Sequence, residues 1–208
     1  RYSVVRYLAS PIPNANGPHV SDPRSGEILE SDINWYHNVM SLLRNWFFIQ
    51  TAAINPEAQT IEFKDEVMGR LIRFVSSHEV GHTLGLPHNM GSSAAYPVDS
   101  LRSASFTKKF GTAPSSSDYA RFNYIAQPEE KGVALMPDIG PYDKHAIEWG
   151  YRPILDKTAK DEKETLYPFL CCSYTGFVAT WIIHTSFRLN LSPFRPTVAL
   201  LGSKMCLP

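Results

Sequence analysis

The beginning of the chain carries the two-residue period of β-strands. Side chains alternate over residues 2–7, which predicts a strand over residues 1–9. A segment rich in Pro, Asn and Gly follows over residues 11–26 and is typical of a loop. Residues 27–36 predict a second strand directly after that loop.

The pattern then changes to the period of amphipathic helices. Hydrophobic residues recur three or four apart over residues 37–54 and again over residues 64–84, which predicts two helices. Gly85 follows the second stripe and is a typical helix stop, since this position favours a left-handed backbone. Shorter helices, each ending at a glycine, are predicted over residues 97–111 and 143–151.

Composition narrows the class of protein. The chain has 208 residues, of which 43% are hydrophobic, enough for one globular domain with a core. Its 20 basic and 20 acidic residues cancel to a formal net charge of zero, which gives no support for a nucleic-acid or anionic-membrane partner. The apolar run over residues 177–183 is far shorter than the ~20 residues of a membrane span. We expect no membrane span in this chain, and the oligomeric state does not follow from its composition.

Both ends of the chain are unusual. The chain starts inside the first predicted strand and without a leader, which predicts a fragment of a longer protein. No acidic residue follows Glu164, and all three cysteines come after it. We therefore expect one domain over residues 1–165 and an atypical tail over residues 166–208. A natural amphipathic appendage and a non-native tail are both open interpretations, and the composition favours the second.

Residues 78–88 read His-Glu-Val-Gly-His-Thr-Leu-Gly-Leu-Pro-His and contain three of the seven histidines. His78 and His82 are four apart on a predicted helix, so both imidazoles leave the same face. Gly85 turns the chain, and His88 returns from the far side of the turn as a third nitrogen ligand. Three neutral histidines suit Zn2+ and leave one or two coordination positions open, as in catalytic zinc sites.

Glu79 lies next to the first histidine, about 100° round the helix, where its carboxylate reaches a water molecule beside the ion. The pattern predicts a zinc-dependent endopeptidase in which Glu79 is the general base, taking a proton from water and passing it to the leaving amine of a protein or peptide substrate. A structural zinc domain is the weaker interpretation, because no cysteine or acidic residue is placed as a fourth ligand.

These eleven residues resemble the active-site signature of the metzincin zinc endopeptidases. The chain over residues 1–165 resembles the catalytic core of a bacterial group of large, secreted or envelope-bound metzincin-like metalloproteases. The resemblance implies an α+β fold with a mixed β-sheet above the cleft, an active-site helix and a loop-rich lower subdomain. It implies that an N-terminal strand and helix of the usual fold are missing here. It also implies a secreted, periplasmic or cell-envelope location.

Metzincins carry a methionine turn beneath the zinc, often Ser-x-Met-x-Tyr, and two segments compete for this place. Residues 115–119 supply the serine and the tyrosine, but Ser117 stands where Met is usual. Met136 is the rival, without a tyrosine at the right offset, and the spacing to the last predicted helix favours residues 115–119. The resemblance then places Tyr119 near the zinc or the oxyanion, although a packing role is also open. A serine beneath the ligands leaves a gap, so Ser117→Met should raise the melting temperature.

Further predictions concern residues outside the motif. The resemblance suggests an edge strand for substrate backbone at residues 26–34. His37 and His145 are isolated and are predicted to be structural or surface histidines. Ser117 and the missing N-terminal strands support an alternative function, a module that binds zinc and peptides without turnover. Four aromatic residues are predicted to lie in the core: Trp35, Trp46, Phe47 and Phe48.

Overall fold

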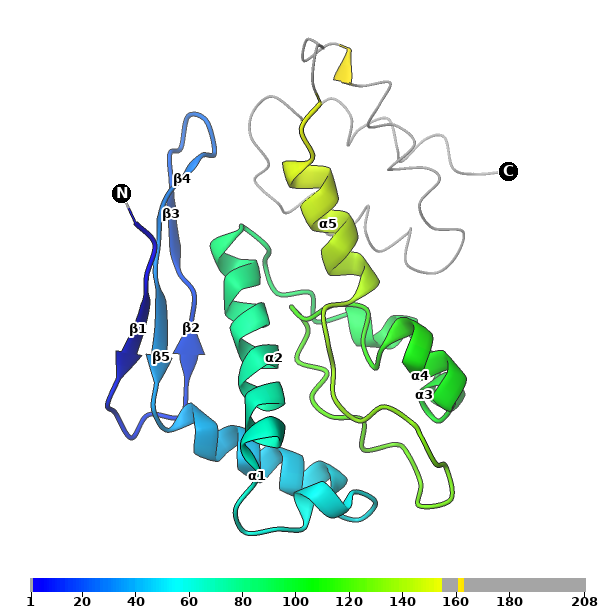
Figure 1. Ribbon diagram of the computed structural model, residues 1–208. Helices are drawn as coiled ribbons and strands as arrows, with labels where there is room; N and C mark the ends of the chain where they lie inside the picture. The colour runs from blue at the N-terminus through cyan, green and yellow to red at the C-terminus, as the bar shows by residue number, and fades with distance from the viewer. Residues whose placement is uncertain (1, 155–160, 163–208) are drawn as a thin grey trace.

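The computed structural model describes residues 2–154 and 161–162, and its strands precede its helices (Figure 1). The predictions for the tail over residues 166–208 therefore lie outside the described residues. The mixture of small sheets and several helices is the α+β fold predicted from the sequence. The elements are β1 (Val5–Leu8), β2 (Ala15–Asn16), β3 (His19–Ser21), β4 (Ile28–Ser31), β5 (Ile33–Tyr36), α1 (Val39–Thr51), α2 (Asp65–Thr83), α3 (Val98–Leu101), α4 (Ala104–Phe110) and α5 (Pro141–Tyr151).

β5 lies at the centre of a three-stranded mixed sheet with strand order β1-β5-β2. β1 runs parallel to β5, with Val5 opposite Ile33. β2 runs antiparallel to β5, with Ala15 opposite Trp35. The single strand predicted over residues 27–36 is therefore two strands, because β4 pairs with β3 in a separate sheet before the chain enters β5.

The segment predicted at residues 26–34 to be an edge strand for substrate backbone forms β4, one of the two strands of the smaller sheet, and the start of β5, which is central in the larger sheet. Its contact with substrate stays a prediction. β2 and β5 are the strands that contact α2, and of these only β2 lies at the edge of the sheet. β2 falls inside the segment predicted to be a loop, since its length is too short to show a two-residue period. The Nδ2 amide of Asn34 donates to Oδ1 of Asn16 (2.8 Å) and links the edge strand to β5.

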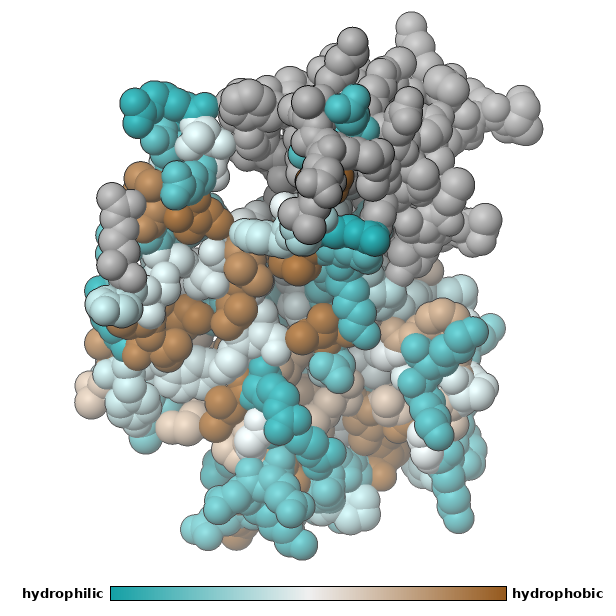
Figure 2. All heavy atoms as spheres, turned by 45° about the horizontal axis from the view of Figure 1, so that its top comes forward, coloured by the Kyte–Doolittle hydropathy of each residue, from teal (hydrophilic) through white to brown (hydrophobic). Residues whose placement is uncertain are grey.

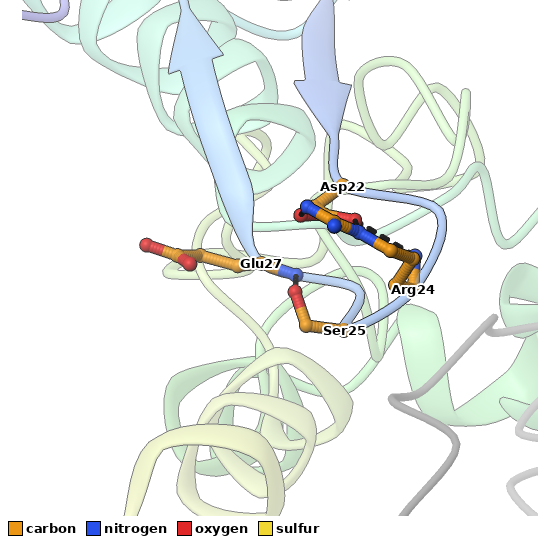
Figure 3. Close-up of polar contacts among 4 residues, drawn as sticks. All are labelled: Asp22, Arg24, Ser25 and Glu27. Atoms are coloured by element: carbon orange, nitrogen blue, oxygen red, sulfur yellow. Dashed lines mark hydrogen bonds and ion pairs between the residues drawn. The ribbon is translucent and has the colours of Figure 1, made fainter.

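The turn between β3 and β4 is closed by Asp22 (Figure 3). Its carboxylate accepts hydrogen bonds from the backbone N–H of Arg24 (2.8 Å) and from the guanidinium (2.8 Å), and its carbonyl accepts from the N–H of Gly26 (2.8 Å). The Arg24 side chain holds the pKa of Asp22 below its ordinary value. Gly26 has φ +75°, a left-handed conformation that lets the chain turn back into β4.

The main hydrophobic core lies between α1 and α2, as the two predicted stripes require. Leu43 and Phe47 of α1 pack against Val67 and Leu71 of α2, and each of these side chains is almost fully buried. Burying each side chain contributes about 1.5–3 kcal/mol to folding. Phe48 is 51% exposed, so its predicted core position is wrong: it follows Phe47 on the helix and points to the other side.

Two helix boundaries also differ from the predictions. The predicted helix over residues 97–111 is broken into α3 and α4, because Ser103 has an extended backbone and its Oγ accepts from the N–H of Phe106 (3.3 Å) as an N-cap. α4 ends at Gly111 as predicted, with φ +78°. α5 runs through Gly150, which therefore does not end it.

Hydrophobic residues on the face drawn in Figure 2 form several patches separated by hydrophilic residues. None of the described helices is long and apolar enough to cross a membrane.

Candidate metal centre and active site

α2 carries the first two histidines of the motif one turn apart and ends in a turn that returns the third. The N–H of Gly85 donates to the carbonyl of His82 (3.0 Å). The N–H of Leu86 donates to the carbonyl of Gly81 (2.9 Å), which completes a Schellman motif. Gly85 has φ +92°, which glycine adopts without strain. This turn brings His88 back to the helix, as the sequence predicted.

The Nε2 atoms of the three histidines converge. Nε2 of His82 lies 3.0 Å from Nε2 of His78 and 3.0 Å from Nε2 of His88, and the third separation is 3.3 Å. Tetrahedral zinc with Zn–N bonds of about 2.0–2.1 Å separates its ligand nitrogens by about 3.4 Å, so the triangle is close to the size that one ion requires. Among the described residues, no further histidine, cysteine or carboxylate joins this group. The three histidines can therefore bind a metal ion together. At least one coordination position of that ion would have no histidine, cysteine or carboxylate ligand from the described residues.

Backbone carbonyls orient two of the imidazoles. Nδ1 of His78 donates to the carbonyl of Ser116, and Nδ1 of His82 donates to the carbonyl of Leu86, both at 2.7 Å. A carbonyl oxygen only accepts, so each Nδ1 carries the hydrogen and each Nε2 keeps its lone pair. Burial lowers the pKa of His78 to about 4 and also lowers the pKa of His88. His78 is therefore neutral at pH 7, the form that binds a metal.

Glu79 is buried outside the histidine group and accepts a hydrogen bond from the backbone N–H of Gly17. Burial raises the pKa of its carboxyl group to about 7, and the Gly17 hydrogen bond opposes this shift. A cation bound by the histidines would favour the charged carboxylate further. A carboxyl group in this position can exchange a proton near neutral pH, as a general base must.

Gly17 directly follows β2 and allows the edge strand to touch α2. A Cβ on Gly17 would lie 2.5 Å from the carbonyl oxygen of Glu79, closer than any side chain permits. Gly17 is not among the site residues predicted from the sequence. The Asn-Gly-Pro stretch signals a turn there, but nothing in it indicates which helix the turn contacts.

The segment Ser115–Tyr119 lies beneath the histidines. Oγ of Ser117 lies 3.6 Å from the position of a Cβ on Gly81, between the two helical histidines. The carbonyl of Ser117 accepts from the N–H of Asn89 (3.0 Å), which directly follows the last histidine. Met136 instead packs against the core between α1 and α2. The structure thus places the serine-containing segment, and not Met136, where the resemblance expects the methionine turn.

Two buried carboxylates tie this segment to the rest of the protein, Asp143 from α5 and Asp118 from within the segment itself. Asp143 of α5 accepts from Oγ of Ser115 (2.6 Å) and from the N–H of Ser116 (2.7 Å). Oδ2 of Asp118 accepts from the hydroxyl (2.9 Å) and the N–H (2.6 Å) supplied by residues 92–93. Ser116 joins Asp143 to His78, because its N–H donates to the carboxylate and its carbonyl accepts from the imidazole. α5 therefore helps to position a candidate ligand.

Tyr119 lies at the histidine group. Its hydroxyl is 3.1 Å from Nε2 of His88, and its ring is 46% exposed. Its ring centroid lies 4.8 Å from that of His88 and 5.5 Å from that of His78. This geometry agrees with a position near the metal better than with a packing role in the core.

The other predicted histidines stay away from the site. His37 is exposed and bonds through Nδ1 to the Tyr7 hydroxyl. His145 lies on α5, where burial lowers its pKa. Neither belongs to the three-histidine group, in agreement with a structural or surface role.

A family model described as Met-zincin matches residues 60–174. This match covers more than half of the chain, including α2, the histidine turn and α5, and the chain belongs to the Met-zincin family. No curated protein and no solved structure matches the chain in the two other comparisons. The family supports zinc as the metal, in agreement with the geometry of the three histidines.

Proposed function

We propose that this chain is a zinc-dependent endopeptidase that acts on protein or peptide substrates, with Glu79 as general base. The position of Glu79 carries the proposal. It lines the same cavity as His78, while the histidine group itself includes no carboxylate. A structural zinc site is closed by four protein ligands, whereas a catalytic one keeps an open position. We also propose a secreted, periplasmic or cell-envelope location, which rests on the family resemblance.

Zinc held by three neutral histidines supplies Lewis-acid activation of water and of a substrate carbonyl. In the proposed reaction, the carboxylate of Glu79 takes a proton from the attacking water and delivers it to the nitrogen of the leaving amine. The N–H of Gly17 holds this carboxylate in place through its hydrogen bond. The hydroxyl of Tyr119 donates to the oxygen that gains negative charge, a role supported by its 3.1 Å distance to Nε2 of His88.

The substitution Glu79→Gln tests the proposal. We expect cleavage of an unfolded protein substrate to fall by about 10²–10⁴-fold, while the bound zinc stays constant, because the amide cannot accept the proton. A zinc chelator should abolish cleavage by the wild-type chain. Glu66→Gln, in the first turn of the same helix and exposed, is the matched control and should keep full activity. A Glu79→Gln protein as active as the wild type would contradict the role of this carboxylate.

One observation favours a second candidate, a module that binds zinc and peptides without cleaving them. Ser117 is fully buried, and its Oγ has no hydrogen-bond partner among the described residues. An unpaired hydroxyl beneath the ligands weakens the support that a methionine would give. Bound zinc and measurable peptide affinity, without turnover by the wild-type chain, would favour this candidate.

A further inference from the structure

A cavity of about 280 Å³ adjoins His78 and Glu79. Residues of α1, α2, the chain before β2 and the segment after Ser117 line it. Many of its lining side chains are apolar or aromatic, such as Trp46 and Phe74. Among these lining residues, Arg121 is the only lysine or arginine.

The guanidinium of Arg121 is held between two aromatic rings. Its Cζ atom lies 3.9 Å from the centroid of Trp46 and 4.8 Å from the centroid of Tyr119. Stacking of this kind presents the edge of the guanidinium, with its N–H groups, to the surroundings. Tyr119 therefore links the cation to the histidine group, because its hydroxyl lies 3.1 Å from Nε2 of His88.

The backbone around Arg121 is fixed in an uncommon conformation. Arg121 has φ +60°, the only described residue other than glycine with a positive φ. Left-handed backbone at such a residue is strained and persists only where neighbours enforce it. Phe122 supplies this restraint: its N–H donates to Oε1 of Gln50 (2.9 Å), and its ring packs edge-on against Phe47 at 5.0 Å.

The N–H groups of Arg121 make no hydrogen bond or ion pair within the described part of the chain. Two carboxyl groups line the same cavity, but each is engaged elsewhere. Asp118 accepts from residues 92–93 and attracts the Arg121 guanidinium through space without a hydrogen bond to it, and Glu79 accepts from Gly17. Burial lowers the pKa of Arg121, yet an arginine stays charged at neutral pH. A partly buried cation without an acceptor is costly unless a partner completes it.

We propose that this cavity is a specificity pocket for a carboxylate of the substrate, which Arg121 binds through its planar pair of N–H donors. The inference rests on the proposed function, because it assigns a substrate class to the same site. The carboxylate comes either from an Asp or Glu side chain near the scissile bond or from the C-terminus of a peptide.

The experiment separates binding from turnover by using the Glu79→Gln protein with zinc bound. Affinities are measured for peptide pairs that differ only by Glu or Gln at one position, with that position moved along the peptide and the C-terminus amidated. A second pair differs only in a free or an amidated C-terminus. We expect one pair to show roughly tenfold to hundredfold tighter binding of the carboxylate form, and which pair does so identifies its source.

Arg121→Gln in the same background should remove this preference, and Arg121→Lys should restore part of it. Arg73→Gln, the same charge change on the exposed face of α2 and outside the cavity, should leave the preference intact. Equal affinities within every pair, binding of no peptide at all, or a preference that survives Arg121→Gln would overturn the inference. If Arg121→Gln does not fold, the paired affinities of the protein with Arg121 intact still decide it.

Cleavage assays on the wild-type chain judge the proposed function separately. Cleavage without any carboxylate preference would overturn the pocket alone. A carboxylate preference without cleavage would support the pocket and contradict the proposed hydrolysis.

Discussion

α2 and the segment over residues 112–123 are held in the protein by different physical means. α2 is a regular helix whose buried side chains Val67 and Leu71 face the core with α1. The segment contains no helix or strand, yet every residue from 112 to 118 is buried. Its serines donate to the carboxylate of Asp143, and the carboxylate of its own Asp118 accepts from residues 92–93.

The helix and the irregular segment therefore contribute to the histidine site in different ways. The helix supplies ligands through its own period, and its stability comes mainly from apolar burial, which tolerates changes of similar volume. The irregular segment supplies the carbonyl that orients His78, and its stability comes from polar pairs that lose most when one partner is removed. Substitutions in the segment should therefore affect stability and metal binding together, whereas substitutions in the helix stripe should affect stability alone.

Gly140→Ala should have the largest effect. A Cβ on Gly140 would lie 1.9 Å from the carbonyl oxygen of Pro114 and 2.8 Å from the nitrogen of Ser115. The backbone of Gly140 has φ −87°, which any residue can adopt. Glycine is needed here because a side chain would clash with neighbouring atoms, not because of the backbone conformation. We expect the free energy of unfolding to fall by about 3 kcal/mol or more and the zinc affinity to fall with it, because the segment must move. Urea unfolding of the zinc-free protein and competition with a chelator measure the two quantities.

The matched control is Gly69→Ala on α2. A Cβ on Gly69 meets nothing within 4 Å, so alanine should stabilise the helix by about 0.5–1 kcal/mol. Similar losses for both glycine substitutions would show that the tight contact at Gly140 does not exist in solution.

Asp143→Ala should have the next largest combined effect on stability and zinc binding. It leaves the N–H groups of Ser116 and Gly140 without their acceptor and should lower the free energy of unfolding by about 2–4 kcal/mol. Zinc affinity should fall by about 10–100-fold, because Ser116, whose carbonyl orients His78, loses its anchor. Isothermal titration with zinc measures this change.

Leu71→Ala tests the contribution of the apolar stripe of α2. The side chain is fully buried in the helix stripe, and its loss should cost about 2–5 kcal/mol of stability. Zinc affinity should stay nearly constant in the folded protein. If both substitutions weakened zinc binding equally, the proposed division between helix and segment would be wrong.

Ser117→Ala should have the smallest effect, and in the opposite direction. Removing a fully buried hydroxyl without a partner should raise the free energy of unfolding by about 1 kcal/mol. Thermal unfolding measures the change. A fall in stability would show that the hydroxyl has a partner in solution, and the rise predicted for Ser117→Met could then not come from relieving an unpaired group.

The candidate ligands could be predicted from the sequence because they are local. The three histidines and Glu79 lie within residues 78–88, where the helical period and the left-handed turn at Gly85 set their relation. The two long helices were predicted for the same reason, since each carries several turns of apolar period. The short edge strand β2 was missed, because its pairing depends on a partner nearly twenty residues away.

The sequence by itself determined the three-histidine motif, the neighbouring carboxylate that we propose as general base and the α+β class of this protein. Only the tertiary structure decided that Gly17 touches Glu79, that Asp143 accepts a hydrogen bond from the N–H of Ser116 and that Arg121 lines the cavity. The reason is that helical period and glycine turns act over a few residues. Close backbone approach and buried polar pairing are decided only when distant segments pack together.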